Sequence, residues 1–220
     1  PTAGFSITSW EGGGGAGQTV AHGLGAKPDF FITKRVDGSQ DYLCYHSALG
    51  AEYMATINAD DEPEDRTEAF NDTEPTATLI TYGSESRVSN ADTHITYAWT
   101  SIPSFSIFTS YTGNGSSTGP FVHCGFTPRW IMIKESGNAG HWFIHDTERS
   151  PLNPDNAQLW ANTNVAEDSS TINDNSSRNQ LDVLSNGFKL RDDGTGLNRS
   201  SGNYIVAAFA EHPFKTARAR

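Results

Sequence analysis

Hydrophobic and polar residues alternate along several short stretches of the chain, and this pattern predicts β-strands. The stretches "FSIT" at 5–8, "FFITKR" at 30–35 and "WIMIKE" at 130–135 are rich in β-branched and aromatic residues. Runs of Gly, Asn, Asp and Ser separate such stretches and predict turns, because Gly and Asn tolerate a positive φ. No stretch shows a helical period over a helical length. We therefore predict an all-β protein, with short helical turns expected near 63–69 or 154–159.

The predicted strands of the first half recur, in the same order, in the second half. Five pairs of segments match: "GFSITSW" at 4–10 with "SFSIFTSY" at 104–111, "VAHGLGAKPDFFITK" at 20–34 with "FVHCGFTPRWIMIK" at 121–134, "DYLCYH" at 41–46 with "HWFIHD" at 141–146, "YMATIN" at 53–58 with "QLWAN" at 158–162, and "DTHITYAWTSIP" at 92–103 with "SGNYIVAAFAEHP" at 201–213. Because an ordered set of matches does not arise easily by chance, we infer an internal duplication.

The repeat predicts an architecture. We expect an antiparallel β-sandwich, lectin-like or jelly-roll-like, built from two pseudo-equivalent repeats at 1–102 and 103–220 that pack as one compact unit. An amphipathic strand cannot cover its own apolar face, so each copy is expected to supply a partner face for the other. The pattern leaves open whether the copies form one large sandwich or two small ones.

Composition narrows the range of partners. The formal net charge is −11, which argues against nucleic acid and against an anionic membrane surface. No apolar run approaches the 18 residues or so that span a bilayer. The chain opens with Pro1 rather than Met, and we expect it to be part of a longer protein. Cys44 and Cys124 lie in apolar runs and are predicted to be buried free thiols.

The motifs that could carry chemistry are weak, and we predict no cofactor, no metal and no catalytic residue. Gly12, Gly14 and Gly17 fit GxGxxG in spacing, but no helical pattern follows, as nucleotide binding requires. His22 and His123 occupy matching places, as His46 and His145 roughly do, which favours structural roles. The acidic runs at 60–65 and 191–193 lack the spacing of a calcium loop, although calcium binding stays open. No pair of carboxylates stands out for glycoside hydrolysis.

Aromatic residues near loops are the best candidates for a ligand site. Trp10, Tyr111 and Trp160 fall at strand ends or beside loops, whereas other aromatics lie within alternating strands. Aromatic faces next to Asn and Asp suit sugars, whose C–H faces stack on rings while their hydroxyls bond to amides and carboxylates. We predict a ligand role for these three residues, with packing at the ends of the sandwich as the alternative.

The chain resembles a known family over nearly its whole length. The segments "GAGQTVAHGLGAKPDFFITK" at 15–34, "YTGNGSSTGPFVHCGFTPRWIMIK" at 111–134, "WANTN" at 160–164, "LSNGFKLR" at 184–191 and "GNYIVAAFAEHPFK" at 202–215 carry the resemblance. They are similar to a C-terminal module of phage tail-fibre-like and other virion structural proteins, a family of unknown function common in marine phages and prophages. One departure is "YAWTSIPSFS" at 97–106, where the family tends towards a phrase of the type "CFAEVPGFS".

The resemblance implies a β-rich module on the surface of a virion. Such modules attach to the host or decorate the particle. They often form homotrimers, and they contact other subunits of the virion. We therefore expect a non-enzymatic module that binds a host cell-surface glycan or receptor, without nucleic acid and without membrane insertion. A purely structural or decorating virion protein is the first alternative, and a polysaccharide depolymerase is the second.

Overall fold

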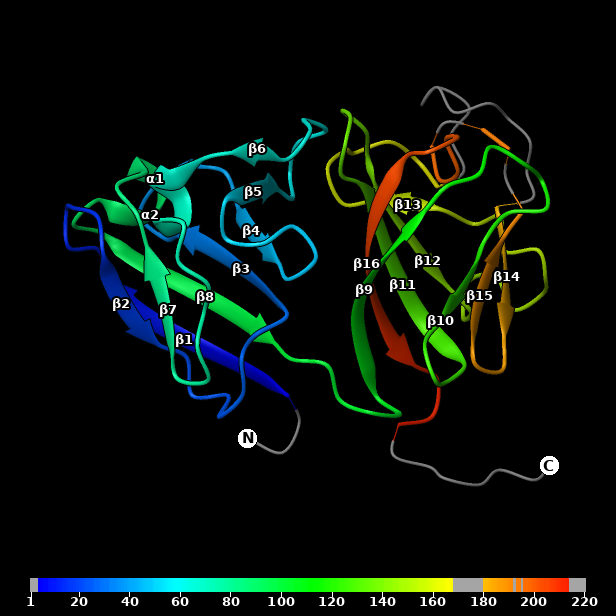
Figure 1. Ribbon diagram of the computed structural model, residues 1–220, viewed down its shortest axis with the longest axis horizontal. Helices are drawn as coiled ribbons and strands as arrows, with labels where there is room; N and C mark the ends of the chain where they lie inside the picture. Colours follow the sequence, from blue (N-terminus) through cyan, green and yellow to red (C-terminus); the bar gives the residue numbers. More distant parts are fainter. Residues whose placement is uncertain (1–3, 168–179, 192, 195, 214–220) are drawn as a thin grey trace. The chain divides into compact units, whose positions relative to one another are not determined.

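The structure is a computed structural model, which describes residues 4–167, 180–191, 193–194 and 196–213 of the 220. The chain divides into two compact units, unit 1 (Pro1–Ser101) and unit 2 (Ile102–Arg220). The division falls one residue before the boundary expected from the sequence. Apart from the one-turn helices α1 (Thr67–Phe70) and α2 (Ser86–Ser89), all elements of the described residues are strands (Figure 1). The predicted all-β class is confirmed.

Unit 1 contains a large and a small antiparallel sheet. Its main sheet has six strands in the order β1 (Phe5–Glu11), β8 (Thr93–Trp99), β3 (Phe30–Arg35), β4 (Leu43–His46), β5 (Tyr53–Thr56) and β6 (Glu64–Asp65). Its small sheet pairs β2 (Gln18–Ala21) with β7 (Leu79–Tyr82). Helix α1 overlaps the end of the segment near 63–69 that was expected to hold a helical turn, and strand β6 occupies the start of that segment, whereas α2 was not predicted and residues 154–159 form no helix.

Unit 2 has the same two kinds of sheet. Its main sheet has five strands in the order β13 (Leu159–Trp160), β12 (Trp142–Asp146), β11 (Pro128–Glu135), β16 (Asn203–Ala210) and β9 (Ser106–Thr112). Its small sheet has three strands in the order β10 (Phe121–His123), β15 (Gly187–Leu190) and β14 (Leu181–Leu184).

The two main sheets have matching strand orders. The order β1-β8-β3-β4-β5 in unit 1 corresponds to β9-β16-β11-β12-β13 in unit 2, and the pair β2-β7 corresponds to β10-β15. The registers agree as well, because Phe31 pairs with Ala98 and with Tyr45, while Ile131 pairs with Ala208 and with His145. This agreement supports the predicted repeat, and an origin by duplication stays an inference.

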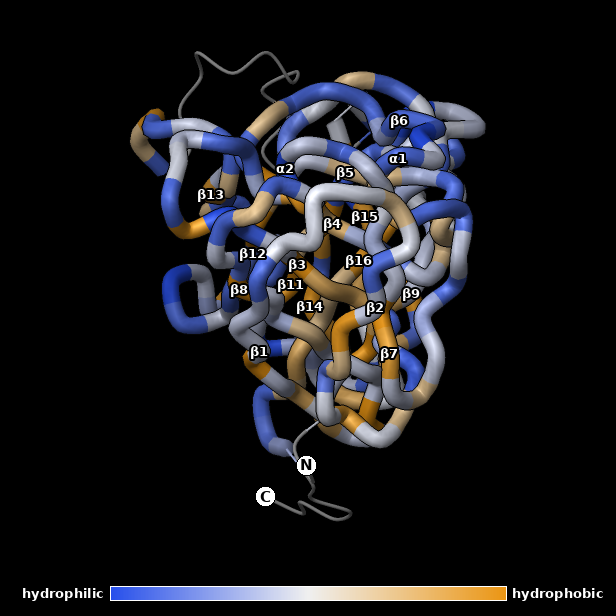
Figure 2. The backbone as a smooth tube through the Cα atoms, turned by 90° about the vertical axis from the view of Figure 1, so that its left-hand side faces the viewer, coloured by the Kyte–Doolittle hydropathy of each residue, from blue (hydrophilic) through white to orange (hydrophobic). Residues whose placement is uncertain are grey.

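Each unit builds its own hydrophobic core between its main and its small sheet. In unit 1 the core joins Phe31 and Tyr45 of the main sheet to Val20 and Ile80 of the small one. Figure 2 shows the hydrophobic stretches of β2 and β7. The core of unit 2 likewise draws all its described members from unit 2. This face of each main sheet is therefore covered by a small sheet of the same unit, and the expectation that each copy also supplies a partner face for the other stays a prediction.

The repeated strand that ends in Lys34 and Lys134 closes a loop in both units. The Nζ of Lys34 donates to the carbonyl oxygen of Gln40, and the Nζ of Lys134 donates to the carbonyl oxygen of Gly140. The side chain of Lys134 is fully buried, so its charge depends on such carbonyl partners. The lysine thus fixes the connection from β3 to β4, and the equivalent connection from β11 to β12.

A buried hydrogen-bond network fixes the core of unit 1. The hydroxyl groups of Thr33, Tyr82 and Thr96 lie 2.8–3.0 Å from one another. The indole Nε1 of Trp10 donates to the Thr96 oxygen at 2.9 Å, and the ring stacks on Tyr82 at 4.5 Å between centroids. Burial raises the pKa of Tyr82 to about 12, so its hydroxyl stays neutral. Two threonines can therefore lie inside the sandwich with their polar groups satisfied.

We predict that Trp10→Ala destabilises the protein by about 3 to 5 kcal/mol, because it leaves a cavity beside Tyr82 and removes the donor to Thr96. Trp10→Phe keeps most of the packing and should cost about 1 kcal/mol. Urea denaturation followed by circular dichroism measures both. An unchanged midpoint for Trp10→Ala would contradict the core role.

The carboxylate of Glu74 ties the loop before β7 to β4. It accepts hydrogen bonds from Lys27 Nζ at 2.6 Å, from the Tyr45 hydroxyl at 2.7 Å and from the Ala51 amide at 2.7 Å. Burial by itself would raise the pKa of Glu74, but these hydrogen bonds outweigh it and hold the pKa below its usual value. The ionised form is therefore favoured by folding.

We predict that Glu74→Gln lowers the free energy of unfolding at pH 7 by less than about 1 kcal/mol, since Lys27 and Glu74 are about half exposed and screened by solvent. A lowered folded-state pKa stabilises above the unfolded pKa of about 4.3 and stops doing so as the pH falls through the folded value. The difference from the wild type should therefore shrink as the pH falls below the unfolded value and through the folded one. Urea titrations from pH 2.5 to 7 measure it, with the exposed Glu62→Gln as control, and a pH-independent difference would contradict this account.

Candidate functional site

The three aromatics predicted to bind a ligand do not come together. Trp10 lies in the core of unit 1, with 8% of its surface exposed. Tyr111 lies in unit 2, where its ring stacks on Tyr204 at 4.7 Å and its hydroxyl donates to the Leu197 carbonyl at 2.6 Å. Trp160 belongs to the core of unit 2. Packing occupies these rings, so the contacts favour the structural alternative, and their ligand role stays a prediction.

The registers also correct the pairing of the histidines. Val20 pairs with Ile80 in unit 1, and Val122 pairs with Phe188 at the equivalent place in unit 2. The residue two positions after this valine is His22 in unit 1 and Cys124 in unit 2. His123 is exposed and corresponds to Ala21, and His145 corresponds to Tyr45 rather than to His46. The buried ring of His22 links two backbone segments. Its Nε2 lies 3.2 Å from the Thr76 carbonyl oxygen, and its Nδ1 accepts a hydrogen bond from the Leu24 amide at 3.2 Å. Burial lowers its pKa, which favours the neutral ring.

The remaining motifs adopt structural roles. The loop with Gly12, Gly14 and Gly17 leads into strand β2, so the helix that nucleotide binding needs is not there. Gly12 itself packs against the carbonyl of Asn90, where a Cβ would not fit. Among the residues the structure describes, no group of three or more His, Cys, Asp or Glu side chains could hold a metal ion. Within the acidic run at 191–193, residue 192 lies outside the described residues.

The two cysteines are buried and free, as predicted. Burial raises the pKa of both thiols, that of Cys124 to about 12. Both thiols are therefore protonated at neutral pH, and neither has the properties of a nucleophile.

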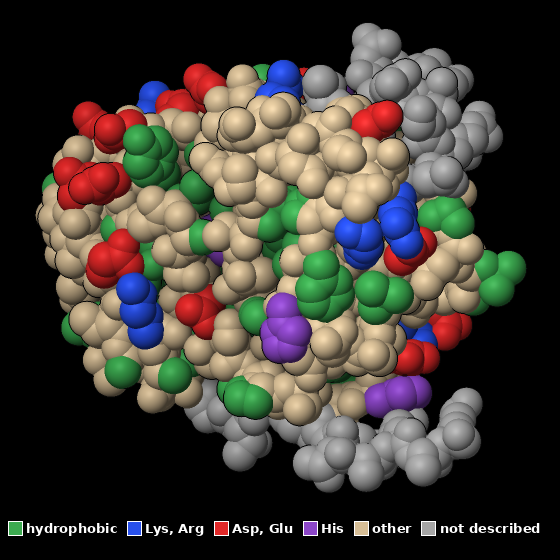
Figure 3. Space-filling view, turned by 45° about the vertical axis from the view of Figure 1, so that its right-hand side comes forward, with side chains coloured by type: hydrophobic (Ala, Val, Ile, Leu, Met, Phe, Trp, Pro, Cys, Tyr) green, Lys and Arg blue, Asp and Glu red, His purple; other side chains and the backbone are tan. Residues whose placement is uncertain are grey.

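The small sheet of unit 2 presents a mixed surface to solvent, which we call the outer face. Strand alternation turns Val122 and Phe188 into the core and leaves Phe121, Lys189 and Asp182 in one cross-strand row on the other side. Phe121 is 43% exposed, and its ring lies 6.4 Å from that of His123. Figure 3 shows that hydrophobic, basic, acidic and histidine side chains are all among the exposed groups in the view that it presents. An exposed aromatic ring thus shares a sheet face with charged groups.

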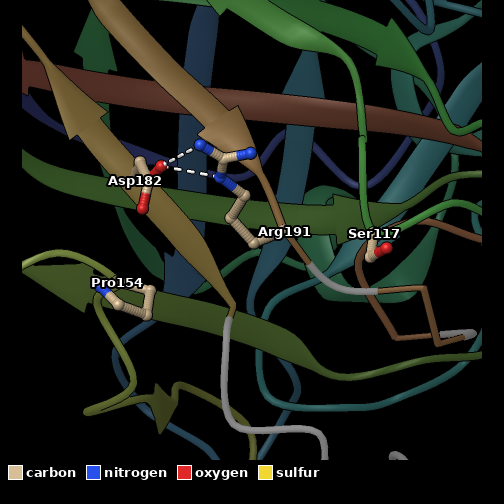
Figure 4. A pocket seen from close by; sticks show the side chains of 4 residues that line it. All are labelled: Ser117, Pro154, Asp182 and Arg191. Atoms are coloured by element: carbon tan, nitrogen blue, oxygen red, sulfur yellow. Dashed lines mark hydrogen bonds and ion pairs between the residues drawn. The ribbon is translucent and has the colours of Figure 1, made fainter.

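A shallow cavity of about 360 Å³ opens beside this row. Ser117, Pro154, Asp182 and Arg191 line it (Figure 4). Arg191 holds one oxygen of Asp182 with two nitrogens, its Nε and Nη2, each at 2.6 Å from Oδ2. The third guanidinium nitrogen points away from Asp182 (Figure 4). The ion pair therefore fixes both side chains while leaving a donor and an acceptor unused by the described residues.

The two charged residues that line the cavity balance each other. Asp182 and Arg191 neutralise each other, and Lys189 donates to the Gly119 carbonyl at 2.7 Å. The exposed hydroxyl of Ser117 can both donate and accept. The wall therefore offers a guanidinium donor, a carboxylate acceptor and a hydroxyl within one open depression. This set matches adjacent hydroxyl groups of a polar, uncharged ligand.

The sequence contains two signals for this site, and neither of them predicts it alone. "LSNGF" at 184–188 is a hairpin signal, because an Asn-Gly pair favours the tight turn that joins β14 to β15. Phe121 and Val122 stand next to each other in an alternating stretch, so one of them must face solvent. Periodicity does not determine which of the two faces solvent, so the sequence alone does not predict that Phe121 is exposed.

In the part of the chain that the structure describes, no helix has the length and apolar character needed to cross a bilayer. Among known proteins, no curated protein and no solved structure matches the chain. One family model does match, that of a domain of unknown function, DUF7483, over residues 1–213. Since this match spans almost the whole sequence, the chain belongs to the family DUF7483.

Proposed function

We propose that the protein is a non-enzymatic binding module of a virion, which attaches to a host cell-surface glycan through the outer face of unit 2. The single observation that carries the proposal is the exposed ring of Phe121 in the same sheet row as Asp182, next to the cavity that Arg191 and Ser117 line. Aromatic rings stack on the apolar faces of sugars, and fixed polar groups bind their hydroxyls.

The geometry suits recognition rather than hydrolysis. Hydrolysis of a glycosidic bond generally takes two carboxylates that flank the bond. Asp182 supplies the one carboxylate among the described residues that line the cavity, and Arg191 already binds it. A carboxylate held in this way has one oxygen engaged and its position fixed, which favours binding over proton transfer.

The virion location rests on the resemblance of the sequence to tail-fibre-like modules. Two further features support an exposed attachment role: the net charge of −11 keeps the surface soluble, and polar loops flank the small sheet of unit 2. The expected homotrimer and contacts with other virion subunits belong to the same proposal. Light scattering of the full chain measures the oligomer independently of ligand binding.

We predict that Phe121→Ala and Arg191→Ala each weaken glycan binding about 10-fold or more, because they remove the stacking surface and one fixed donor. Binding of the full chain to a glycan array and to host cells measures this loss. Tyr53→Ala is the matched control, because Tyr53 is an exposed aromatic of unit 1. The proposal fails if the wild type binds no envelope component, or if the control loses as much affinity as Phe121→Ala.

We also predict a preference for neutral over acidic glycans. The local charge at Asp182 and Arg191 sums to zero, and the protein as a whole repels anions. Affinity for the neutral ligand should therefore change less than about 2-fold between 50 and 500 mM salt, since screening acts on net charge. Titration calorimetry with neutral and uronic-acid oligosaccharides tests this, and a strong preference for the acidic ligand at low salt would contradict it.

A further inference from the structure

A group of buried polar side chains lies inside unit 2, beside the residues that line the cavity. We call it the polar cluster and define it by five members: His145, Asp155, Gln158, Trp160 and Gln180. Each has at most 5% of its surface exposed. None of them lines the cavity, and the proposed function does not use them.

Backbone pairing brings the members together from three segments. Strands β12 and β13 pair Phe143 with Trp160 and Ile144 with Leu159, so the next position along the ladder sets His145 opposite Gln158. The segment before β13 runs along β14, since the Asp155 amide donates to the Leu181 carbonyl at 2.7 Å. The backbone amide of Gln180 donates to the side-chain oxygen Oδ1 of Asn156 at 3.3 Å.

The polar atoms of the cluster are not satisfied by one another. His145 Nδ1 lies 3.6 Å from Asp155 Oδ1, beyond the range of a hydrogen bond. The following buried atoms have no hydrogen-bond partner among the described residues: both ring nitrogens of His145, Asp155 Oδ2, Gln158 Oε1, Gln180 Oε1 and Trp160 Nε1. Folded proteins leave few such atoms, so this number in one region calls for a partner.

We infer that the polar cluster is an internal binding site for ordered water. Three of the unpartnered atoms are oxygen acceptors, Trp160 Nε1 is a donor, and each ring nitrogen of His145 can take part in a hydrogen bond. Water supplies two donors and two acceptors without adding charge. A divalent cation fits less well, because Asp155 is the one carboxylate of the cluster and a buried net positive charge would remain. Buried water typically makes about three hydrogen bonds to such groups.

The site has a structural consequence for the outer face. Asp155 follows Pro154 and pairs with Leu181, which precedes Asp182, so the cluster adjoins two residues that line the cavity. The backbone carbonyl of Gln180 accepts a hydrogen bond from the backbone amide of Arg191 at 2.9 Å. Water that bridges His145 to Asp155 would therefore hold in place the backbone that carries the Asp182–Arg191 pair.

A crystal structure of the full chain at about 1.5 Å resolution or better tests the inference. We expect at least one water within about 3.2 Å of both Asp155 Oδ2 and a ring nitrogen of His145. The inference is overturned if these atoms bond directly to protein groups, or if anomalous scattering shows a metal ion between them.

A second experiment tests whether His145 is a hydrogen-bond partner of this water. His145→Phe removes one partner of the water, and we expect its density to disappear or its occupancy to fall by at least half. His123→Phe is the matched control, since His123 is exposed on the outer face and its replacement should leave the internal water unchanged. Equal water density in His145→Phe and in the wild type would contradict the assigned partners. If His145→Phe does not fold, the wild-type structure alone decides.

Discussion

Burial of one face of each main sheet under a small sheet of the same unit is the constraint on which the rest of the structure depends. In unit 2, Ile131 and Phe143 meet Val122 and Phe188 in one cluster. Strands with apolar inner residues cannot remain exposed to water, and the hydrophobic effect gains about 25 cal/mol for each Å² that they bury. Because the small sheet is needed for burial, its opposite side is free to carry the exposed residues of the candidate site.

The same backbone positions support different polar chemistry in the two units. Arg35 of unit 1 pairs with Asp92, whereas Glu135 at the matching place in unit 2 pairs with Arg199, so the charges are exchanged. Strand order and register depend on backbone hydrogen bonds and on which residues face the core. Polar pairs at strand ends need only mutual complementarity, so they can vary while the fold stays constant. Function is therefore to be sought in features that belong to one unit alone.

The sequence predicted the strands of the main sheets well, because alternation reports directly which side of a strand is buried. It did not predict what covers that side, and the small-sheet strands β7 and β14 were not identified as such. The predicted equivalence of His22 with His123 was wrong by one position. It followed the identical residue type, whereas the strand registers of the two small sheets make Val20 equivalent to Val122. Trp10 was predicted to bind a ligand because it ends a strand, but the stacking partner Tyr82 comes from a distant segment that no local pattern reveals.

The central claim is that each unit has its own core, and hydrogen exchange of the full chain carrying Phe31→Ala tests it most directly. Phe31 belongs to the core of unit 1, and its truncation should cost about 3 to 5 kcal/mol there. The account predicts that amides of β3 and β8 lose protection while those of β11 and β16 keep the protection seen in the wild type. Loss of protection to the same extent in both units would show one shared core and contradict the account.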